Sequence, residues 1–464
     1  MIDGLIKGAD LSSLLEVEAA GGRFFDKACR DGSQPSAALR SDEATGSRQQ
    51  ATEFPPVGAA LTRRVSSPHV TDGNRQQATS NRQQATEFPP VGAALTRRVS
   101  SPHVADGNRQ QATGNRQQAT EGPSQDVLEI LKAHGVNLIR LRLWNDPYDP
   151  NGKPYGAGTN DLPRTMTLAR RCRDLGLPWL LDFHYSDFWA DPGKQYPPKA
   201  WEKLDAAGLE RAVYDFTHET MRALKAADLL PAMVAPGNEL SNGLLWPLGK
   251  TPNWENIARF VSAGIRAIRA VAPELPIMLH LDNGGNNALY RDWFDRWFAN
   301  GGEDFDCIGL SYYPFWHGGL EDLRANLQDI AARYGKPLIV AETSTAFTLA
   351  ECNRWEGIDL GEKRGLAANE KTAANVPYPM SPEGQQAFLR DLWEVIRSVP
   401  GDLGRGFIWW EPAWLPVKGS GWTTPEGLAY VREKGPGGNE WANQAMFDYD
   451  GRALPILETL EQLQ

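Results

Sequence analysis

The run NLIRLRLW at residues 137–144 is followed by an amphipathic stretch near residues 164–175 and then by a second short run, PWLLDFHY, at residues 178–185. Short runs rich in apolar and β-branched residues predict strands, and the stretch between them predicts a helix. The order strand, helix, strand is typical of a parallel sheet. The unit therefore predicts an α/β fold, provided that it recurs along the chain.

The same unit recurs from one end of the chain to the other. The six other strand-like runs are LIKGAD (5–10), PAMVAPGNE (231–239), PIMLHLD (276–282), DCIGLSYYP (306–314), PLIVAETS (337–344) and RGFIWWEP (405–412). Helical stretches lie near residues 124–134, 164–175, 201–227, 252–272, 288–299, 319–334, 382–398 and 452–463. Ser124 and the Ser381-Pro382 pair are start signals for two of them. Eight strands in strict alternation with helices predict a (β/α)₈ TIM barrel.

One segment interrupts this pattern in the loop after the first strand. RQQATEFPPVGAALTRRVSSPHV stands at residues 48–70 and again at residues 82–104, a period of 34 residues. A tetratricopeptide unit has this length, but the copies contain Pro-Pro and lack that repeat's signature. Residues 46–120 contain no Trp, Tyr or Lys, so they bury too little apolar surface to fold. We expect residues 1–45 and 121–464 to form one barrel and residues 46–120 to be a disordered insert.

Charge and composition exclude several classes of protein. The net charge of −10 argues against nucleic acid as the main partner, because phosphate binders carry a basic face. No apolar run approaches the roughly 20 residues of a membrane helix. The four cysteines have no metal-type spacing, and the start MIDGLIKGAD has no features of a signal peptide.

Polar and aromatic residues end nearly every predicted strand, at the edge where the active site of such a barrel lies. They are Asp10, Arg142, Trp144, Asp182, His184, Tyr185, Asp187, Asn238, Glu239, His280, Asp282, Asn283, Tyr312, Tyr313, Glu342, Trp409, Trp410 and Glu411. A strand end that faces only solvent would carry turn residues instead. The pattern predicts a binding cleft with flat aromatic platforms.

Two of these residues, Glu239 and Glu342, follow apolar runs on the fourth and seventh strands. Paired carboxyl groups across a barrel mouth suit glycoside cleavage, in which one is a protonated acid and the other an ionised nucleophile. A structural ion pair with an arginine is the alternative for either residue alone. Asn238 is expected to hold a sugar hydroxyl, and Tyr312 is expected to hydrogen-bond Glu342.

His184 and His280 raise a rival class, the metal-dependent barrel hydrolases. That class needs His-x-His on the first strand, where this chain offers only Asp10. We therefore expect both histidines to line the site or brace its carboxylates. Asp182 is equally consistent with a role in the core or in the site.

The segments LLDFHYSDFWADPGKQ, VAPGNELSNGLLWP, IGLSYYPFWHG and IVAETSTAFTL resemble glycoside hydrolase family 53, the endo-β-1,4-galactanases that cleave arabinogalactan. Matching segments span the chain apart from the insert. The resemblance implies a retaining, endo-acting hydrolase with Glu239 as acid/base and Glu342 as nucleophile. The substrate-binding residues that it implies are Arg142, Trp144, His184, Asp187, Asn238, Tyr312 and Trp409.

The resemblance also carries expectations beyond the site. It implies no cofactor for catalysis, but bacterial members hold a structural calcium in the loops after strands 7 and 8. Here these loops include ECNRWEGIDLGEKRGLAANE and EGLAYVREKGPGGNE, whose acidic residues show no ligand spacing that identifies a calcium site. A monomer that acts on galactan, a side chain of pectin, in the extracellular space or the periplasm is expected from the family.

Two alternatives to a galactanase stay open. The same retaining chemistry could act on another β-1,4-glycan, such as mannan or glucan. The chain could instead be an inactive carbohydrate-binding barrel, impaired by the insert on its catalytic face.

Overall fold

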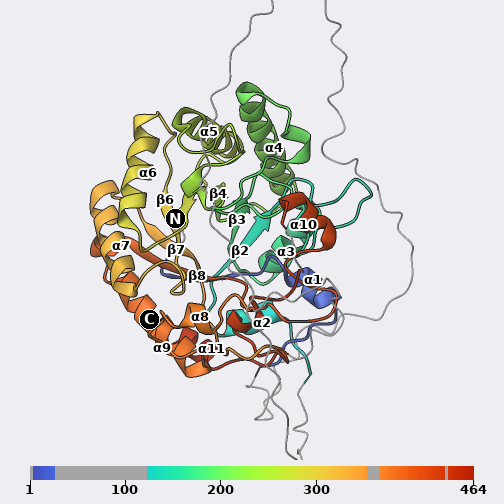
Figure 1. The fold of residues 1–464 in the computed structure, drawn as a ribbon, viewed down its shortest axis with the longest axis vertical. Coiled ribbons are helices and arrows are strands. Elements are labelled where there is room, and N and C mark those ends of the chain that lie inside the picture. The colour runs from blue at the N-terminus through green and yellow to red at the C-terminus, as the bar shows by residue number, and fades with distance from the viewer. Residues whose placement is uncertain (1–3, 27–122, 353–365, 434–436) are drawn as a thin grey trace, which may run out of the picture. The chain divides into compact units, whose positions relative to one another are not determined.

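The computed structural model describes residues 4–26, 123–352, 366–433 and 437–464 of the chain (Figure 1). The predicted insert, residues 46–120, lies outside the described residues, as do parts of both loops in which calcium is expected. The domain boundaries and the calcium site therefore stay predictions.

Eight parallel strands form one sheet that closes on itself. They are β1 (Ile6–Asp10), β2 (Leu138–Leu143), β3 (Trp179–Phe183), β4 (Met233–Pro236), β5 (Met278–Leu281), β6 (Cys307–Ser311), β7 (Leu338–Thr343) and β8 (Gly404–Trp409). Their order is β4-β3-β2-β1-β8-β7-β6-β5, and a parallel bridge between Val234 and Ile277 joins the two edges. The predicted (β/α)₈ barrel is confirmed.

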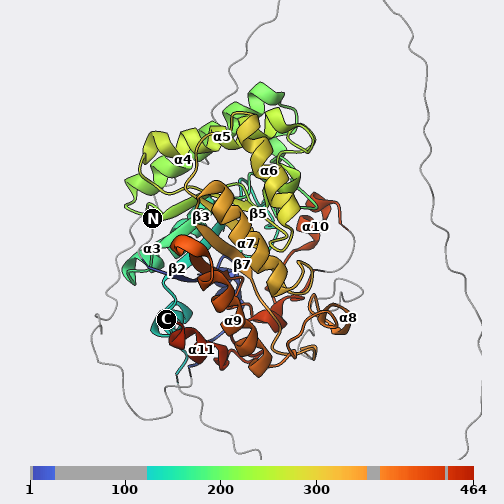
Figure 2. The same ribbon diagram turned by 90° about the vertical axis from the view of Figure 1, so that its left-hand side faces the viewer.

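A helix follows each strand and covers the outside of the barrel. The eight predicted helices are α2 (Val127–Ala133), α3 (Leu162–Asp174), α4 (Ala206–Ala226), α5 (Trp254–Val271), α6 (Asn287–Ala299), α7 (Leu320–Tyr334), α9 (Pro382–Arg397) and α11 (Ile456–Gln462). Figure 2 shows α7 and α9 side by side over β7. The short helices α1 (Leu14–Ala19), α8 (Glu370–Ala373) and α10 (Pro425–Val431), which were not predicted, lie in the loops.

Capping side chains explain where two helices differ from prediction. Ser381 caps α9 as expected, and its side chain accepts from the Gly384 amide. Helix α2 begins after Asp126 rather than Ser124, because the Asp126 carboxylate accepts from the Leu128 amide. The long helix expected from residue 201 begins only after Asp205, whose carboxylate caps α4.

The inward-facing residues of the barrel change from apolar at the strand starts to polar at the strand ends. The apolar cluster consists of Ile6, Leu138, Leu180, Met233, Ala235, Met278, Cys307, Ile339, Ala341 and Ile408. Because side chains alternate along a strand, the residue two positions further on faces the same way. Three such positions carry the buried polar side chains of Arg140, Asp182 and His280. The polar layer therefore rests on an apolar floor.

A bulge in β7 turns Glu342 into the barrel. Strict alternation from Ile339 and Ala341, which both belong to the inner cluster, would point Glu342 outward. The register between β6 and β7 shifts, however, so that Leu310 pairs with Val340 and the next residue, Ser311, pairs with Glu342. One extra residue in β7 re-aims the side chain, as bulges do near active sites.

The chain leaves and re-enters the barrel at neighbouring points on either side of the predicted insert. The Gln125 amide donates to the Phe24 carbonyl at 3.0 Å, and the two residues form an antiparallel bridge.

We expect deletion of residues 46–120 to shift the melting temperature by less than about 2 °C, because the barrel's own pairing spans the junction. Calorimetry of both chains measures this, and a loss above about 5 °C would make the segment part of the folded core.

Candidate active site

A cavity opens at the C-terminal ends of the strands. Its wall consists of Arg142, His184, Trp189, Ala190, Asp191, Pro192, Lys194, Asn238, Glu239, Asp282, Tyr313, Trp316, His317, Glu342, Trp410, Trp422, Glu433 and Trp441. These residues come from the ends of β2 to β8 and the loops behind them. Carboxyl groups and tryptophan rings share the wall, which suits a ligand with hydroxyl groups and flat apolar faces.

Glu239 stands on a backbone turn that ends β4. Gly237 adopts a φ of 120°, which favours glycine, and Glu239 itself is left-handed with φ 47° and ψ 60°. A left-handed non-glycine residue costs on the order of 1–3 kcal/mol and is frequent at functional sites. Glu239 is 8% exposed and is one of the residues that line the cavity.

Glu342 faces Glu239 from β7 and is held by two donors. Arg140 Nη2 lies 2.8 Å from its Oε1, and the Tyr313 hydroxyl donates to its Oε2 at 2.9 Å. One carboxyl oxygen of Glu342, one of Glu239 and one ring nitrogen of His280 lie within 4.8 Å of one another. The two carboxyl groups thus form a close pair in a nearly dry setting.

The surroundings of the pair assign its shared proton to Glu239. Burial, the neighbouring Glu342 carboxylate and Asp282 raise the pKa of Glu239 well above its usual value. Burial also raises the pKa of Glu342, but the Arg140 guanidinium opposes that shift, as does the Tyr313 hydrogen bond. For Glu239 a hydrogen bond with Ser311 opposes the rise in pKa, and within the described part of the chain it has no ion pair with an arginine or lysine. These surroundings favour the proton on Glu239 and the negative charge on Glu342.

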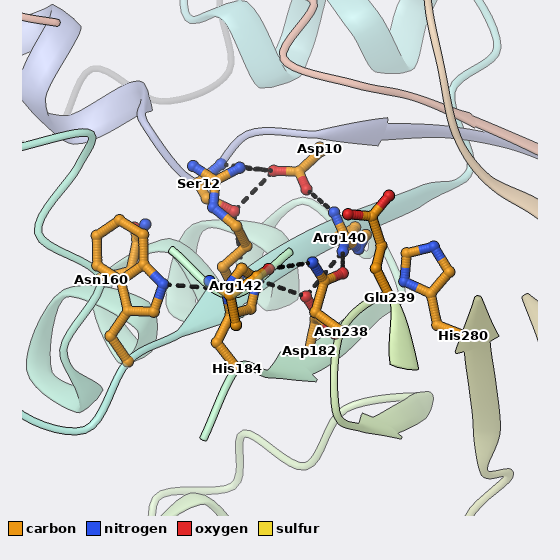
Figure 3. A network of polar contacts seen from close by, with 12 residues as sticks. Asp10, Ser12, Arg140, Arg142, Asn160, Asp182, His184, Asn238, Glu239 and His280 are labelled. Atoms are coloured by element: carbon orange, nitrogen blue, oxygen red, sulfur yellow. Dashed lines mark hydrogen bonds and ion pairs between the residues drawn. The ribbon is translucent and has the colours of Figure 1, made fainter. Parts of the chain in front are cut away.

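Arg140, which the sequence did not single out, is the hub of the buried network (Figure 3). Its guanidinium contacts Asp10 at 2.5 Å, Asp182 at 2.7 Å, Asn238 at 2.8 Å and Glu342 at 2.8 Å. These carboxylates raise its pKa against the opposing effect of burial. Three buried carboxylates therefore share one permanent positive charge, and one of them, Asp10, also pairs with Arg142 at 3.3 Å.

Asp182 belongs to this network and is not in the cavity wall. Besides Arg140, its carboxylate contacts His184 Nε2 at 3.0 Å, and the pKa of Asp182 is lowered to about 2 because these contacts outweigh burial. His184 lines the cavity as expected. His280 is fully buried and is not among the residues of the cavity wall; its Nε2 meets Ser311 Oγ at 2.9 Å, and burial lowers its pKa to about 3.

The hydrogen bond expected from Tyr312 to Glu342 comes from Tyr313 instead. The Tyr312 hydroxyl donates to the Gly318 carbonyl at 3.0 Å, and its ring packs against Phe388 of α9. Consecutive residues at a strand end point to opposite sides. Of the two tyrosines in SYYP, only the second lines the cavity, and the prediction for Tyr312 was wrong on this point.

The two tyrosines offer a matched pair of variants. We expect Tyr313→Phe to lower kcat about 10- to 100-fold, because a hydrogen bond to a charged group contributes about 1.5–3 kcal/mol. Tyr312→Phe should leave kcat unchanged and lower the free energy of unfolding by about 1 kcal/mol. Steady-state kinetics and urea unfolding of both variants measure this. Equal kcat values for the two would contradict the role of Tyr313.

The other residues predicted to bind substrate divide into two groups. Arg142, His184 and Asn238 line the cavity, whereas Trp144, Asp187, Tyr312 and Trp409 do not. The Asn238 amide is already engaged, since its nitrogen donates to the Ala190 carbonyl and its oxygen accepts from Arg140. The direct substrate contacts of these residues stay predictions.

Three of the residues outside the cavity wall are held by hydrogen bonds of their own, and one of them, Trp144, supports a residue that lines the wall. Trp144 Nε1 donates to His184 Nδ1 at 3.2 Å. Asp187 accepts from the Lys199 amide and pairs with its ammonium group, each at 2.8 Å. Trp409 Nε1 donates to the Gln444 carbonyl, and the neighbouring Trp410 lines the cavity in its place. Alternation along β8 could have distinguished these two tryptophans, because Ile408 already faces inward.

Arg142 packs against two rings of the predicted aromatic lining, of which Trp189 was not singled out by the sequence. Its guanidinium lies 4.4 Å from the Trp189 ring and 5.9 Å from that of Trp410. Its Nη2 lies 2.7 Å from Glu411 Oε1. Burial raises the pKa of Glu411 to about 7, although the pairing with Arg142 opposes that rise. Trp189 and Trp410 therefore have fixed positions in the cavity wall.

Among the described residues, Glu239, His280 and Glu342 form the group that could hold a metal ion. This donor set fits a cation poorly. Arg140 already lies on Glu342 and would repel a second positive charge, while His280 Nε2 is engaged with Ser311. The geometry suits an acid–carboxylate pair better than a metal centre.

An eight-stranded (β/α)₈ barrel with paired carboxyl groups in an aromatic cavity defines a glycosidase. The model of glycosyl hydrolase family 53 matches residues 6–460. The chain belongs to this family. Within the described residues, no helix combines the length and apolar character needed to cross a membrane.

Known relatives and solved structures agree with this assignment. An uncharacterized protein in the bgaB 5′ region of Niallia circulans is 43% identical over 348 residues, 73% of this chain and 87% of that protein. The endo-β-1,4-galactanase of Bacillus subtilis strain 168 is 35% identical over 358 residues, 73% of this chain and 80% of that protein. The GH53 catalytic domain of Ignisphaera aggregans is 30% identical, with a TM-score of 0.72 over 99% of this chain and 96% of that domain.

Proposed function

We propose that the protein is a retaining endo-β-1,4-galactanase that cleaves galactan and arabinogalactan. The observation that carries the proposal is the close pair of Glu239 and Glu342, of which one is set up to be protonated and the other ionised. The relative from Bacillus subtilis supports galactan as the substrate.

The proposed reaction has two steps. Glu342 attacks the anomeric carbon while Glu239 gives its proton to the departing glycosidic oxygen, so that a galactosyl-enzyme ester forms on Glu342. Glu239, now ionised, then takes a proton from water, and the water oxygen attacks the anomeric carbon and releases Glu342. Arg140 and Tyr313 keep the nucleophile ionised and aimed between the steps.

The spacing of the carboxyl groups supports retention of configuration. Retaining glycosidases have carboxyl groups about 5–5.5 Å apart, whereas inverting ones leave about 6.5–9.5 Å for a water molecule. Here the closest oxygens of Glu239 and Glu342 lie within 4.8 Å. Proton NMR during early hydrolysis should show the β-anomer first, and an α-anomer would contradict retention.

The aromatic wall supports a polysaccharide substrate that runs along an open cavity. Trp316 is 47% exposed at its edge, and Trp189, Trp410, Trp422 and Trp441 line it. Tryptophan rings pack against the apolar faces of sugars and hold successive units. A cavity with this lining suits attack within a chain.

Substrate comparison tests the proposal. Reducing-end release and viscosity should be followed on β-1,4-galactan, arabinogalactan, mannan and carboxymethyl cellulose. We expect galactan to be cleaved fastest, with an early fall in viscosity because cleavage is internal. Faster cleavage of mannan or cellulose would assign another glycan, and galactan binding without turnover would make the protein a carbohydrate-binding barrel.

The pH dependence of kcat/KM follows from the two protonation states. Glu342 must be ionised, so activity is lost as the pH falls through its pKa in the free enzyme. Glu239 must be protonated, so activity is lost as the pH rises through its pKa, which lies above the usual carboxyl value. We expect a bell-shaped profile whose alkaline limb disappears in Glu239→Gln. An alkaline limb of the same midpoint in that variant would contradict the assignment.

A further inference from the structure

The backbone that carries Glu239 is capped by side chains from two other parts of the barrel. Gln195 Nε2 donates to the Asn238 carbonyl at 2.8 Å and lies 3.4 Å from the Glu239 carbonyl. The indole nitrogen of Trp293, on α6, donates to the Leu240 carbonyl at 2.9 Å. Three successive carbonyls therefore meet buried N–H donors around the left-handed residue.

Gln195 lies on the loop between β3 and α4 and is 2% exposed. A tight turn precedes it, in which Asp191 and Lys194 exchange backbone hydrogen bonds of 2.8 and 3.0 Å. The Gln195 carbonyl accepts from the Trp246 amide at 2.8 Å. Its backbone is thus fixed on both sides, so that the amide group approaches the turn from one direction.

Two more hydrogen bonds connect the same loops. The side-chain amide of Asn238 donates to the Ala190 carbonyl at 2.8 Å, and the side-chain amide of Asn242 donates to the Pro192 carbonyl at 2.8 Å. The loop after β3 and the turn after β4 therefore behave as one unit. Within this unit, only the Gln195 side chain contacts both the Asn238 carbonyl, which precedes the Glu239 nitrogen, and the Glu239 carbonyl, which follows the Glu239 α-carbon.

We infer that Gln195 is a positioning residue that holds the Glu239 carboxyl where it can protonate the leaving oxygen; this inference rests on the proposed function. The left-handed φ and ψ of Glu239 set the direction of its Cα–Cβ bond, and relaxation of this strain would swing the carboxyl group away from Glu342. Two carbonyl groups that converge on one side repel each other, and the Gln195 amide offsets that repulsion. A shift of about 1 Å in a catalytic group is enough to lower a rate about 100-fold.

The dependence on the leaving group separates this role from a general loss of stability. A sugar leaving group needs the proton of Glu239, whereas 2,4-dinitrophenolate departs without one. The kcat/KM of a retaining glycosidase reports the first step only, so it isolates the acid role from the later base role. A mispositioned acid therefore affects galactan far more than a dinitrophenyl β-galactobioside.

The experiment compares Gln195→Met and the nearly isosteric Gln195→Glu with the full-length parent chain. We expect kcat/KM on galactan to fall about 10- to 100-fold and kcat/KM on 2,4-dinitrophenyl β-1,4-galactobioside to fall less than about 3-fold. Gln386→Met is the matched control, because the Gln386 amide donates to the Pro455 carbonyl and Thr459 between α9 and α11, outside the cavity wall. It should leave both values unchanged.

Equal losses on the two substrates, or no loss on either, would overturn the inference while galactan hydrolysis by the parent still supports the proposed function. A parent chain that cleaves neither substrate would overturn both. Two Gln195 variants are used so that a folding failure of one, seen by calorimetry, leaves the other to decide.

Discussion

Glu342→Gln is expected to lower kcat on β-1,4-galactan on the order of 10⁴-fold or more, because the amide cannot form the galactosyl ester. The carboxylate accepts from Arg140 at 2.8 Å and from Tyr313 at 2.9 Å, and both donors fix its orientation in the cavity wall. Among the described residues, no other carboxylate combines a contact with Arg140 and a place in the cavity wall.

Azide distinguishes a lost nucleophile from a damaged fold. A small anion can enter the space opened by Glu342→Ala and attack the anomeric carbon in place of the carboxylate. We expect azide to restore part of the turnover on 2,4-dinitrophenyl β-galactobioside and to yield the α-galactobiosyl azide. Galactan hydrolysis by Glu342→Gln within a few-fold of the parent would contradict the nucleophile assignment.

Arg140→Met is expected to have the largest effect on stability. The change leaves Asp10, Asp182 and Glu342 buried without their shared cation, and breaking a buried ion pair costs about 3–5 kcal/mol. It should also impair catalysis, because the pKa of Glu342 rises once the arginine no longer opposes burial. Urea unfolding and the acid limb of the pH profile measure the two effects.

Arg171→Met is the control for this variant. Arg171 also pairs with two carboxylates, Glu18 at 2.8 Å and Asp126 at 2.9 Å, but its side chain is 24% exposed and lies outside the cavity wall. Partly exposed pairs contribute about 1 kcal/mol or less, so the loss of stability should be small and kcat unchanged. Similar unfolding free energies for the two variants would contradict the role of Arg140 as the hub of a buried network.

The alternation of strands and helices could be read from the sequence, because apolar runs and amphipathic stretches are local signals. The pairing of Glu239 and Glu342 followed from it, since the ends of parallel strands meet at one edge. The hydrogen bond to Glu342 was expected from Tyr312 and comes from Tyr313, because the choice depends on which face of β6 turns into the barrel. The sequence also missed Gln195, whose role arises only when two loops distant in sequence come together.

Arg140 illustrates a different limit. A strand that reads LIRLRL looks half exposed, since arginine is rarely buried without a partner. Arg140 is nevertheless fully buried, because Asp10, Asp182 and Glu342 arrive from three other strands to compensate its charge. Such compensation between strands can be seen only once the barrel has closed.

Covalent trapping tests the central claim most directly. The parent chain is incubated with 2,4-dinitrophenyl 2-deoxy-2-fluoro-β-galactobioside, in which fluorine slows the second step, and the labelled protein is digested and sequenced by mass spectrometry. We predict one added fluorogalactobiosyl group, carried by Glu342. A label on Glu239, on any other residue, or no label together with active hydrolysis of galactan would contradict the account.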